Sequence, residues 1–203
     1  MKKIISALCI AVGVISLTSC NEKAKLAGNI VGTWNSNPER IATADTRATT
    51  TIEPTLIFLK DSTSKTGGDI NGYVKFSVLS GTKPQAAAVQ PISVTADGKA
   101  SITGRWEAID DDEILVKWDY SSLKVSVDSD AIYNNYDYLT QQNSETIENI
   151  PMSLDQMINA QLSAALQTEV FNYGKIDDIK FINESTSMKC EINDNDCIFS
   201  KLL

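Results

Sequence analysis

Residues 99–128, KASITGRWEAIDDDEILVKWDYSSLKVSVD, predict the fold of the chain because apolar and polar residues alternate along them. A period of two is typical of a strand with one buried face. The first strand of this stretch places on one face Ala100, Ile102, Gly104, Trp106 and Ala108. The next two strands place on that face Ile114, Val116, Trp118, Tyr120, Leu123, Val125 and Val127. The pattern predicts a three-stranded antiparallel meander with one solvated face.

Two short turns set the register of this meander. Asp110-Asp111-Asp112 closes the first hairpin, and Ser121-Ser122 closes the second. The shortest turns then pair Trp106 with Val116, Gly104 with Trp118, Ile102 with Tyr120, and Leu123 with Tyr120. A glycine opposite an indole leaves room for the ring to lie across the neighbouring strand.

The rest of the chain predicts a barrel or a sandwich. Further strands are expected over residues 30–35, 50–60, 72–79, 89–95, 176–182, 187–192 and 197–202. Turns are predicted at Gly67-Gly68, Asn71-Gly72, Gly81 and Asp97-Gly98. About ten short strands with such turns indicate an all-β, mainly antiparallel fold.

One amphipathic helix is expected near the C-terminus, over about residues 153–171. Its apolar face consists of Leu154, Met157, Ile158, Leu162, Ala165, Leu166 and Val170. Ser153 and Gln156 form a capping box at its start, and Gly174 follows its end. The polar face has no lysine or arginine to attract anionic lipid, so we expect the helix to pack on the sheet.

The first twenty residues predict export. The apolar run from Ile4 to Leu17 follows a basic Met1-Lys2-Lys3 segment and has 14 residues, fewer than the ~20 of a membrane-spanning helix. It ends in Leu17-Thr18-Ser19-Cys20, which resembles the signal of bacterial lipoproteins. The resemblance implies cleavage after residue 19 and acyl chains such as palmitate on Cys20. An ordinary secretory signal cleaved nearby is the alternative.

The same resemblance divides the chain and gives it a location. Residues 1–19 are the signal peptide, residues 20–29 form a polar lipidated tether, and residues 30–203 form one domain. Acyl chains on Cys20 anchor the mature protein in a membrane. Asn21 stands where an inner-membrane retention aspartate would stand, which implies the outer membrane, on its surface or periplasmic face.

The cysteines that remain after processing predict a disulfide bond. Cys9 leaves with the signal and Cys20 is lipidated, so Cys190 and Cys197 are left in an oxidising compartment. A hairpin that turns at Asn193-Asp194 places the two directly opposite each other. We expect a structural Cys190–Cys197 bridge, with two buried reduced thiols as the alternative.

A second resemblance lies in the first predicted strand, Ile30-Val31-Gly32-Thr33-Trp34. Gly32 and Trp34 match the Gly-x-Trp signature of lipocalins, and Gly104-Arg105-Trp106 repeats it. With the lipoprotein signal, the chain is similar to lipocalin-like lipoproteins of the Bacteroidota. The resemblance implies an up-and-down barrel of about 8–10 strands that binds a small apolar or amphipathic ligand. The predicted helix departs from the family, because three strands follow it here.

Composition disfavours several other functions. The net charge is −8, or −10 after signal removal, which is unsuited to binding nucleic acid through phosphate contacts. The chain has no histidine, and no Ser-x-x-Lys opens a predicted helix, so we expect no enzyme and no cofactor. Acidic turns at Asp110-Asp111-Asp112 and at Asp194 and Asp196 offer weak calcium ligands at most, and we expect no metal site.

Two further segments suggest contacts with envelope components. Tyr133, Tyr136 and Tyr138 lie in a long connection and suit stacking on a glycan or a peptide, unless they cover an open barrel end. An interaction protein that uses this segment or a sheet edge is therefore the alternative function. Asp61-Ser62-Thr63 is similar to an O-glycosylation sequon of those bacteria, with Ser62 as acceptor, or it is a plain turn.

Overall fold

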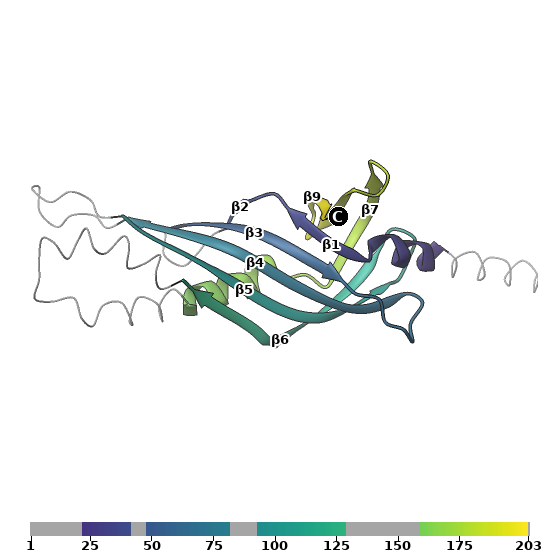
Figure 1. Cartoon of the computed structure of the whole chain (residues 1–203), viewed down its shortest axis with the longest axis horizontal. Coiled ribbons are helices and arrows are strands. Elements are labelled where there is room, and N and C mark those ends of the chain that lie inside the picture. The colour runs from purple at the N-terminus through teal and green to yellow at the C-terminus, as the bar shows by residue number, and fades with distance from the viewer. Residues whose placement is uncertain (1–21, 42–47, 82–92, 129–158, 203) are drawn as a thin grey trace, which may run out of the picture.

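The computed structural model describes residues 22–41, 48–81, 93–128 and 159–202, which form a closed ring of antiparallel strands (Figure 1). The strands are β1 (Gly32–Ser36), β2 (Glu39–Ile41), β3 (Ala48–Phe58), β4 (Gly67–Gly81), β5 (Ser93–Ala108), β6 (Ile114–Val127), β7 (Lys175–Ile182), β8 (Ser187–Ile192) and β9 (Asn195–Leu202). Each strand pairs with its neighbour in sequence, except that β1 pairs with both β3 and β9. The predicted all-β, mainly antiparallel barrel is confirmed.

The strands are of unequal length, and this shapes the molecule. Figure 1 shows β3, β4 and β5 running along its length, with β7 and β9 gathered toward one end. Beyond those shorter strands, the inner face of the long strands is covered by a helix over 159–165 and the π-helical turn η1 (Leu166–Val170). Leu162 and Leu166 of this element are buried in the core, so the predicted helix packs on the sheet over its described part.

A helix over residues 22–30 stands where the sequence predicted a tether over 20–29, so the tether prediction is wrong for residues 22–29, while residues 20 and 21 lie outside the described residues. Leu26, Ala27 and Ile30 are each at most 2% exposed and join the same core as the barrel. Their spacing puts them on one helical face, while Glu22 and Lys25 are exposed. The polar residues that suggested a tether are therefore the outer face of a packed helix. No helix among the described residues is long and apolar enough to cross a membrane.

The first hairpin of the meander has the predicted register, but the prediction of a second turn is wrong. Trp106 pairs with Val116 and Gly104 with Trp118, as expected. The chain does not reverse at Ser121-Ser122. Instead β6 continues along β5 after a bulge that removes the predicted pairs of Tyr120.

Asp119 explains why the chain bulges there and does not turn back. Its carboxylate accepts hydrogen bonds from the backbone N–H of Ser121 at 3.0 Å and from the Ser121 hydroxyl at 2.6 Å. The Ser122 hydroxyl donates to the Asp119 carbonyl and accepts from the Thr103 N–H on β5. The extra residues of β6 are thus bonded locally, and the strand resumes its pairing beyond them.

Several glycines that predicted turns lie inside strands. Gly67-Gly68 and Asn71-Gly72 belong to β4, and Asp97-Gly98 joins two predicted strands into β5. A Cβ at Gly98 would lie 2.3 Å from the Phe76 ring, and one at Gly72 would lie 2.6 Å from the Phe171 ring. These glycines make room for aromatic rings that cross the sheet.

Candidate functional site

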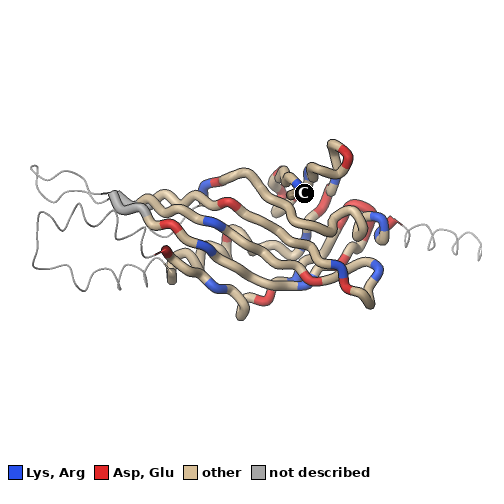
Figure 2. The backbone as a smooth tube through the Cα atoms, in the orientation of Figure 1, with Lys and Arg blue, Asp and Glu red and all other residues tan. Residues whose placement is uncertain are grey.

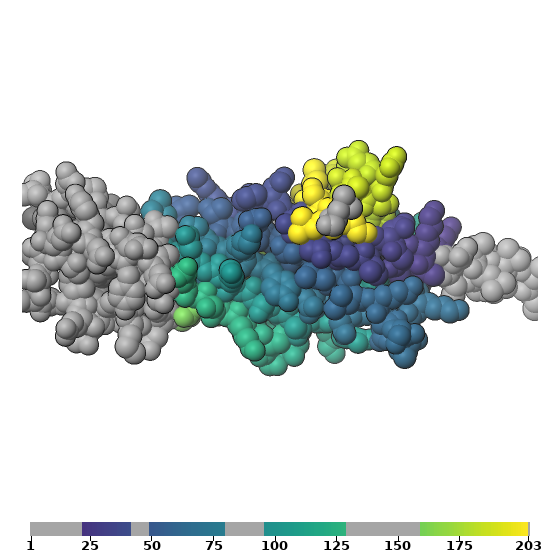
Figure 3. Space-filling view, viewed as in Figure 1, coloured from purple at the N-terminus to yellow at the C-terminus, as the bar shows by residue number. Residues whose placement is uncertain are grey.

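The Gly-x-Trp residues close one end of the barrel. Trp34 is fully buried, and its indole N–H donates to the carbonyl of Ile30 at 2.6 Å. Lys201 of β9 lies over the Trp34 ring, 5.0 Å from its centre, and its ammonium donates to the carbonyl of Asn29 at 3.2 Å. Gly32 has a φ of +134°, and a Cβ there would lie 2.7 Å from Cε of Lys201. Gly32 and Trp34 thus join the helix over 22–30 to the first and last strands, which lie together in Figure 3.

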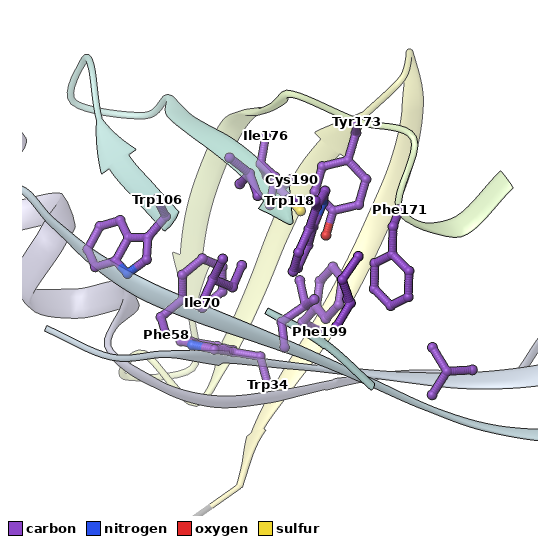
Figure 4. Packing of buried hydrophobic residues seen from close by; sticks show 14 of the residues in the cluster. Trp34, Phe58, Ile70, Trp106, Trp118, Phe171, Tyr173, Ile176, Cys190 and Phe199 are labelled. Atoms are coloured by element: carbon purple, nitrogen blue, oxygen red, sulfur yellow. The ribbon is translucent and has the colours of Figure 1, made fainter. Parts of the chain in front are cut away.

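Large aromatic side chains fill the barrel interior (Figure 4). Trp118 is in T-shaped or edge contact with the rings of Phe171 and Tyr173, at centroid distances of 5.0 and 5.7 Å. Nearer the closed end, Phe58 and Trp106 are in edge contact at 5.7 Å. These ring contacts pack the interior between the closed end and the opposite end of the barrel.

A pocket of about 380 Å³ opens there, at the Ser36 end of β1, and we call it the mouth pocket. Its apolar wall is formed by Pro54, Leu56, Val170, Phe171, Ile192 and Phe199. Its polar rim is formed by Ser36, Glu39, Glu169, Asn193, Asn195 and Asp196. Tyr173 and Cys197 complete the lining. Its volume is within the range of small-molecule sites, and its lining combines an apolar wall with a polar rim.

A break between β1 and β2 forms one side of the mouth pocket. β1 pairs with residues 55–58 of β3, and β2 pairs with residues 50–52, so Glu53 and Pro54 have no partner on that edge. Proline has no backbone N–H to offer a neighbouring strand, which suits Pro54 to this break. Pro54 lies inside the strand predicted over residues 50–60, and a proline there indicates a break in the pairing along one edge. This opening was not predicted from the sequence.

The opposite side of the mouth pocket is the segment over 169–173, which two hydrogen bonds hold in place. The hydroxyl of Tyr120 on β6 donates to the carbonyl of Phe171 at 2.9 Å. The side-chain amide of Asn193 donates to the carbonyl of Asn172 at 3.0 Å. Asn193 belongs to the two-residue turn between β8 and β9, whose residues both have positive φ, as in a type I′ hairpin. The wall is therefore attached to β6 and to the C-terminal hairpin.

Three groups that line the mouth pocket, Glu39, Tyr173 and Cys197, have raised pKa values. Partial burial raises the pKa of Glu39. Burial, followed by the nearby Glu39 and Asp196 carboxylates, raises the pKa of the Cys197 thiol. Burial also raises the pKa of Tyr173. At neutral pH the thiol and the phenol are therefore protonated, and neither is activated as a nucleophile.

The predicted register of the C-terminal hairpin is confirmed, but the predicted disulfide is absent. Cys190 pairs with Cys197 as expected, yet both are free thiols. In a hairpin with a two-residue turn, the pair next to the turn, Ile192 and Asn195, is a hydrogen-bonded pair. Hydrogen-bonded and non-hydrogen-bonded pairs alternate along the strands, so Cys190 and Cys197, two positions further on, are a hydrogen-bonded pair as well. Opposed Cβ atoms lie farther apart at such positions than a disulfide requires. Burial raises the pKa of Cys190 to about 12, which keeps its thiol unreactive.

Ser62, the predicted glycosylation acceptor, is exposed in a loop that Asp61 organises. The Asp61 carboxylate accepts hydrogen bonds from the Thr63 N–H at 2.8 Å and the Thr63 hydroxyl at 2.7 Å, and it pairs with Arg105 at 3.0 Å. The Thr63 bonds and then Arg105 lower the pKa of Asp61 to about 2. The loop is thus a formed turn that presents the Ser62 hydroxyl to solvent.

The remaining predicted residues fall into two groups. Those outside the described residues are Cys20, Tyr133, Tyr136 and Tyr138. The acidic turns are described, and no group of three or more histidine, cysteine, aspartate or glutamate side chains there is arranged to hold a metal ion. Burial and then the neighbouring carboxylates raise the pKa of Asp112. Figure 2 shows acidic and basic residues interspersed along the strands.

The chain matches no protein-family model, no curated protein and no solved structure. The mouth pocket therefore stands as the candidate site on the geometry of this chain alone.

Proposed function

We propose that the protein is a membrane-anchored, lipocalin-like lipoprotein that binds a small amphipathic ligand in the mouth pocket without converting it. The observation that carries this proposal is the pairing of an apolar wall with a polar rim in one pocket. The filled interior supports the mouth, and not a deep cavity, as the place of binding. A ligand held there buries its apolar part against the wall and leaves its polar end at the rim.

Anchoring through Cys20 gives this barrel a defined orientation. The helix over 22–30 begins two residues after Cys20, and two residues span at most about 7 Å. Since that helix is part of the closed end, the closed end is held beside the outer membrane. The mouth pocket lies at the other end of β1 and faces away from the lipid. Radiolabelled palmitate is expected to enter the wild type and not Cys20→Ala, and equal labelling would contradict the anchor.

Native mass spectrometry of the purified protein tests the binding function. We expect a co-purifying small molecule with the wild type and its loss in Val170→Trp, because the larger side chain fills the pocket from its wall. Gln167→Trp is the matched control, since Gln167 is exposed on the same π-helical turn and does not line the pocket. Equal retention in both variants, or a wild type that binds none of a library of amphiphiles, would refute the proposal.

A second candidate function is an envelope interaction protein, and one observation favours it. Among the described strands, β6 pairs with β7 at only two positions, Ile114 and Leu115. Much of β6 therefore pairs with a described strand on one side only, and an extended peptide adds to such an edge. A photo-crosslinker at Lys124 of β6 should then capture a protein partner, whereas one at Lys75, inside the sheet, should not. Tyr133, Tyr136 and Tyr138 belong to the same alternative.

A further inference from the structure

The mouth pocket has an unbalanced charge. Glu39 and Glu169 line it and form no ion pair or side-chain hydrogen bond within the described residues. No lysine or arginine is among the described residues that line it. The third acidic residue, Asp196, is paired with Lys189 at 3.1 Å. The uncompensated charge at this opening is therefore negative.

Strand register places Glu39 on the inner face of the sheet. Glu39 pairs directly with Ile52, which is fully buried, and directly opposed residues lie on the same face. The next residue, Arg40, alternates to the outer face and so cannot balance that carboxylate from within the pocket. Glu39 is exposed at the opening, so its carboxylate is accessible to a positive group of a ligand. Glu169 stands on the other side of the opening, on η1.

The surface beneath these carboxylates is apolar. Leu56, Phe171 and Phe199 are each at most 4% exposed and line the pocket from three different segments. A ligand that enters must therefore offer apolar surface to the wall. Its polar end comes to the level of Glu39 and Glu169.

We infer that the mouth pocket selects small amphipathic ligands whose polar end is a positively charged amine. The inference rests on the proposed function and adds the charge of the ligand to it. An ammonium group meets two carboxylates at the rim while its alkyl or aryl part covers the wall. The net charge of the chain, −8, attracts cations and repels anions at longer range.

Three probes of equal chain length separate charge from apolar contact: octylammonium, octanol and octanoate, each below its micellar concentration. Titration calorimetry at pH 7 is expected to give an affinity for octylammonium about tenfold or more above that for octanoate, with octanol between them. The preference should weaken in high salt, because both carboxylates lie at the rim. It should disappear in the Glu39→Gln/Glu169→Gln protein while octanol binding stays unchanged.

The control is Glu107→Gln/Glu184→Gln, which removes the same charge from two exposed residues that do not line the pocket. This protein should keep the preference for the amine, and its circular dichroism and that of the test variant should match the wild type. Equal binding of all three probes to the wild type would overturn the charge inference and leave the binding function intact. Failure of every probe to bind would instead count against the mouth pocket as a ligand site.

Discussion

Lys201 near the end of the last strand lies over the ring of Trp34 on the first strand, with its ammonium 5.0 Å from the ring centre. The same ammonium donates to the carbonyl of Asn29 at 3.2 Å, near the end of the helix over 22–30. One side chain thus links the helix, the first strand and the last strand. Closure of the ring depends on residues that are far apart in the sequence.

Replacing Lys201 with alanine should therefore destabilise the whole barrel. The change removes a cation–π contact and a charged hydrogen bond, and it uncovers part of the indole. We expect a loss of about 1–2 kcal/mol in the free energy of unfolding, measured by urea denaturation. Lys180→Ala is the control, because Lys180 is exposed and its one ion pair in the described residues is a long surface pair with Asp178, at 3.8 Å. Equal small effects of the two substitutions would show that Lys201 does not hold the closed end.

Gly32→Ala should destabilise the protein for two separable reasons. The backbone at Gly32 has a φ of +134°, which alanine rarely adopts, and the added Cβ would lie 2.7 Å from Lys201 Cε. We expect a loss of about 1–3 kcal/mol. In the Gly32→Ala/Lys201→Ala protein the clash is gone and the backbone strain stays. The loss of stability in this double variant should therefore be smaller than the sum of the losses in the two single variants. Strict additivity would contradict contact between these residues.

Asp61 should contribute a pH dependence to stability at low pH. Its pKa is lowered from 3.8 to about 2 in the folded protein, so its charged form favours the folded state. This contribution is present above pH 3.8 and is lost as the pH falls through 2. The difference in stability between the wild type and Asp61→Asn should shrink between pH 4 and pH 2 in urea titrations. Glu184→Gln, at an exposed residue without an ion pair in the described part, should show no such convergence.

Both cysteine thiols should react slowly in the folded protein. Burial raises the pKa of Cys190 to about 12 and also raises that of Cys197, so little thiolate is present at pH 8. In the mature, lipidated protein, titration with Ellman's reagent should find two thiols in urea without reductant, and far slower reaction in native buffer. If urea exposes no thiol, the cysteines are bridged and the hairpin is the oxidised one that the sequence predicted.

Local pairings in this protein were predictable because they depend on neighbouring residues. Alternation and a two-residue turn were enough to pair Cys190 with Cys197, and the first meander hairpin followed from its Asp110-Asp111-Asp112 turn. The apolar face of the helix that contains Leu162 and Leu166 also followed from spacing alone. In each case the partner lies within a few residues or along one helical face.

The tertiary structure decided whatever depends on distant partners. Gly98 was predicted as a turn because glycine favours turns, but the ring of Phe76 on β4 needs its space inside β5. The residues of the helix over 22–30 looked like a polar tether until the barrel supplied a core for Leu26 and Ile30. The mouth pocket joins β2, η1 and the C-terminal hairpin, so its inward carboxylate at Glu39 is visible only once the ring has closed. Sequence alone determined the all-β class and the register of two hairpins, since these follow from local periodicity and short turns, whereas the site required contacts between segments more than a hundred residues apart.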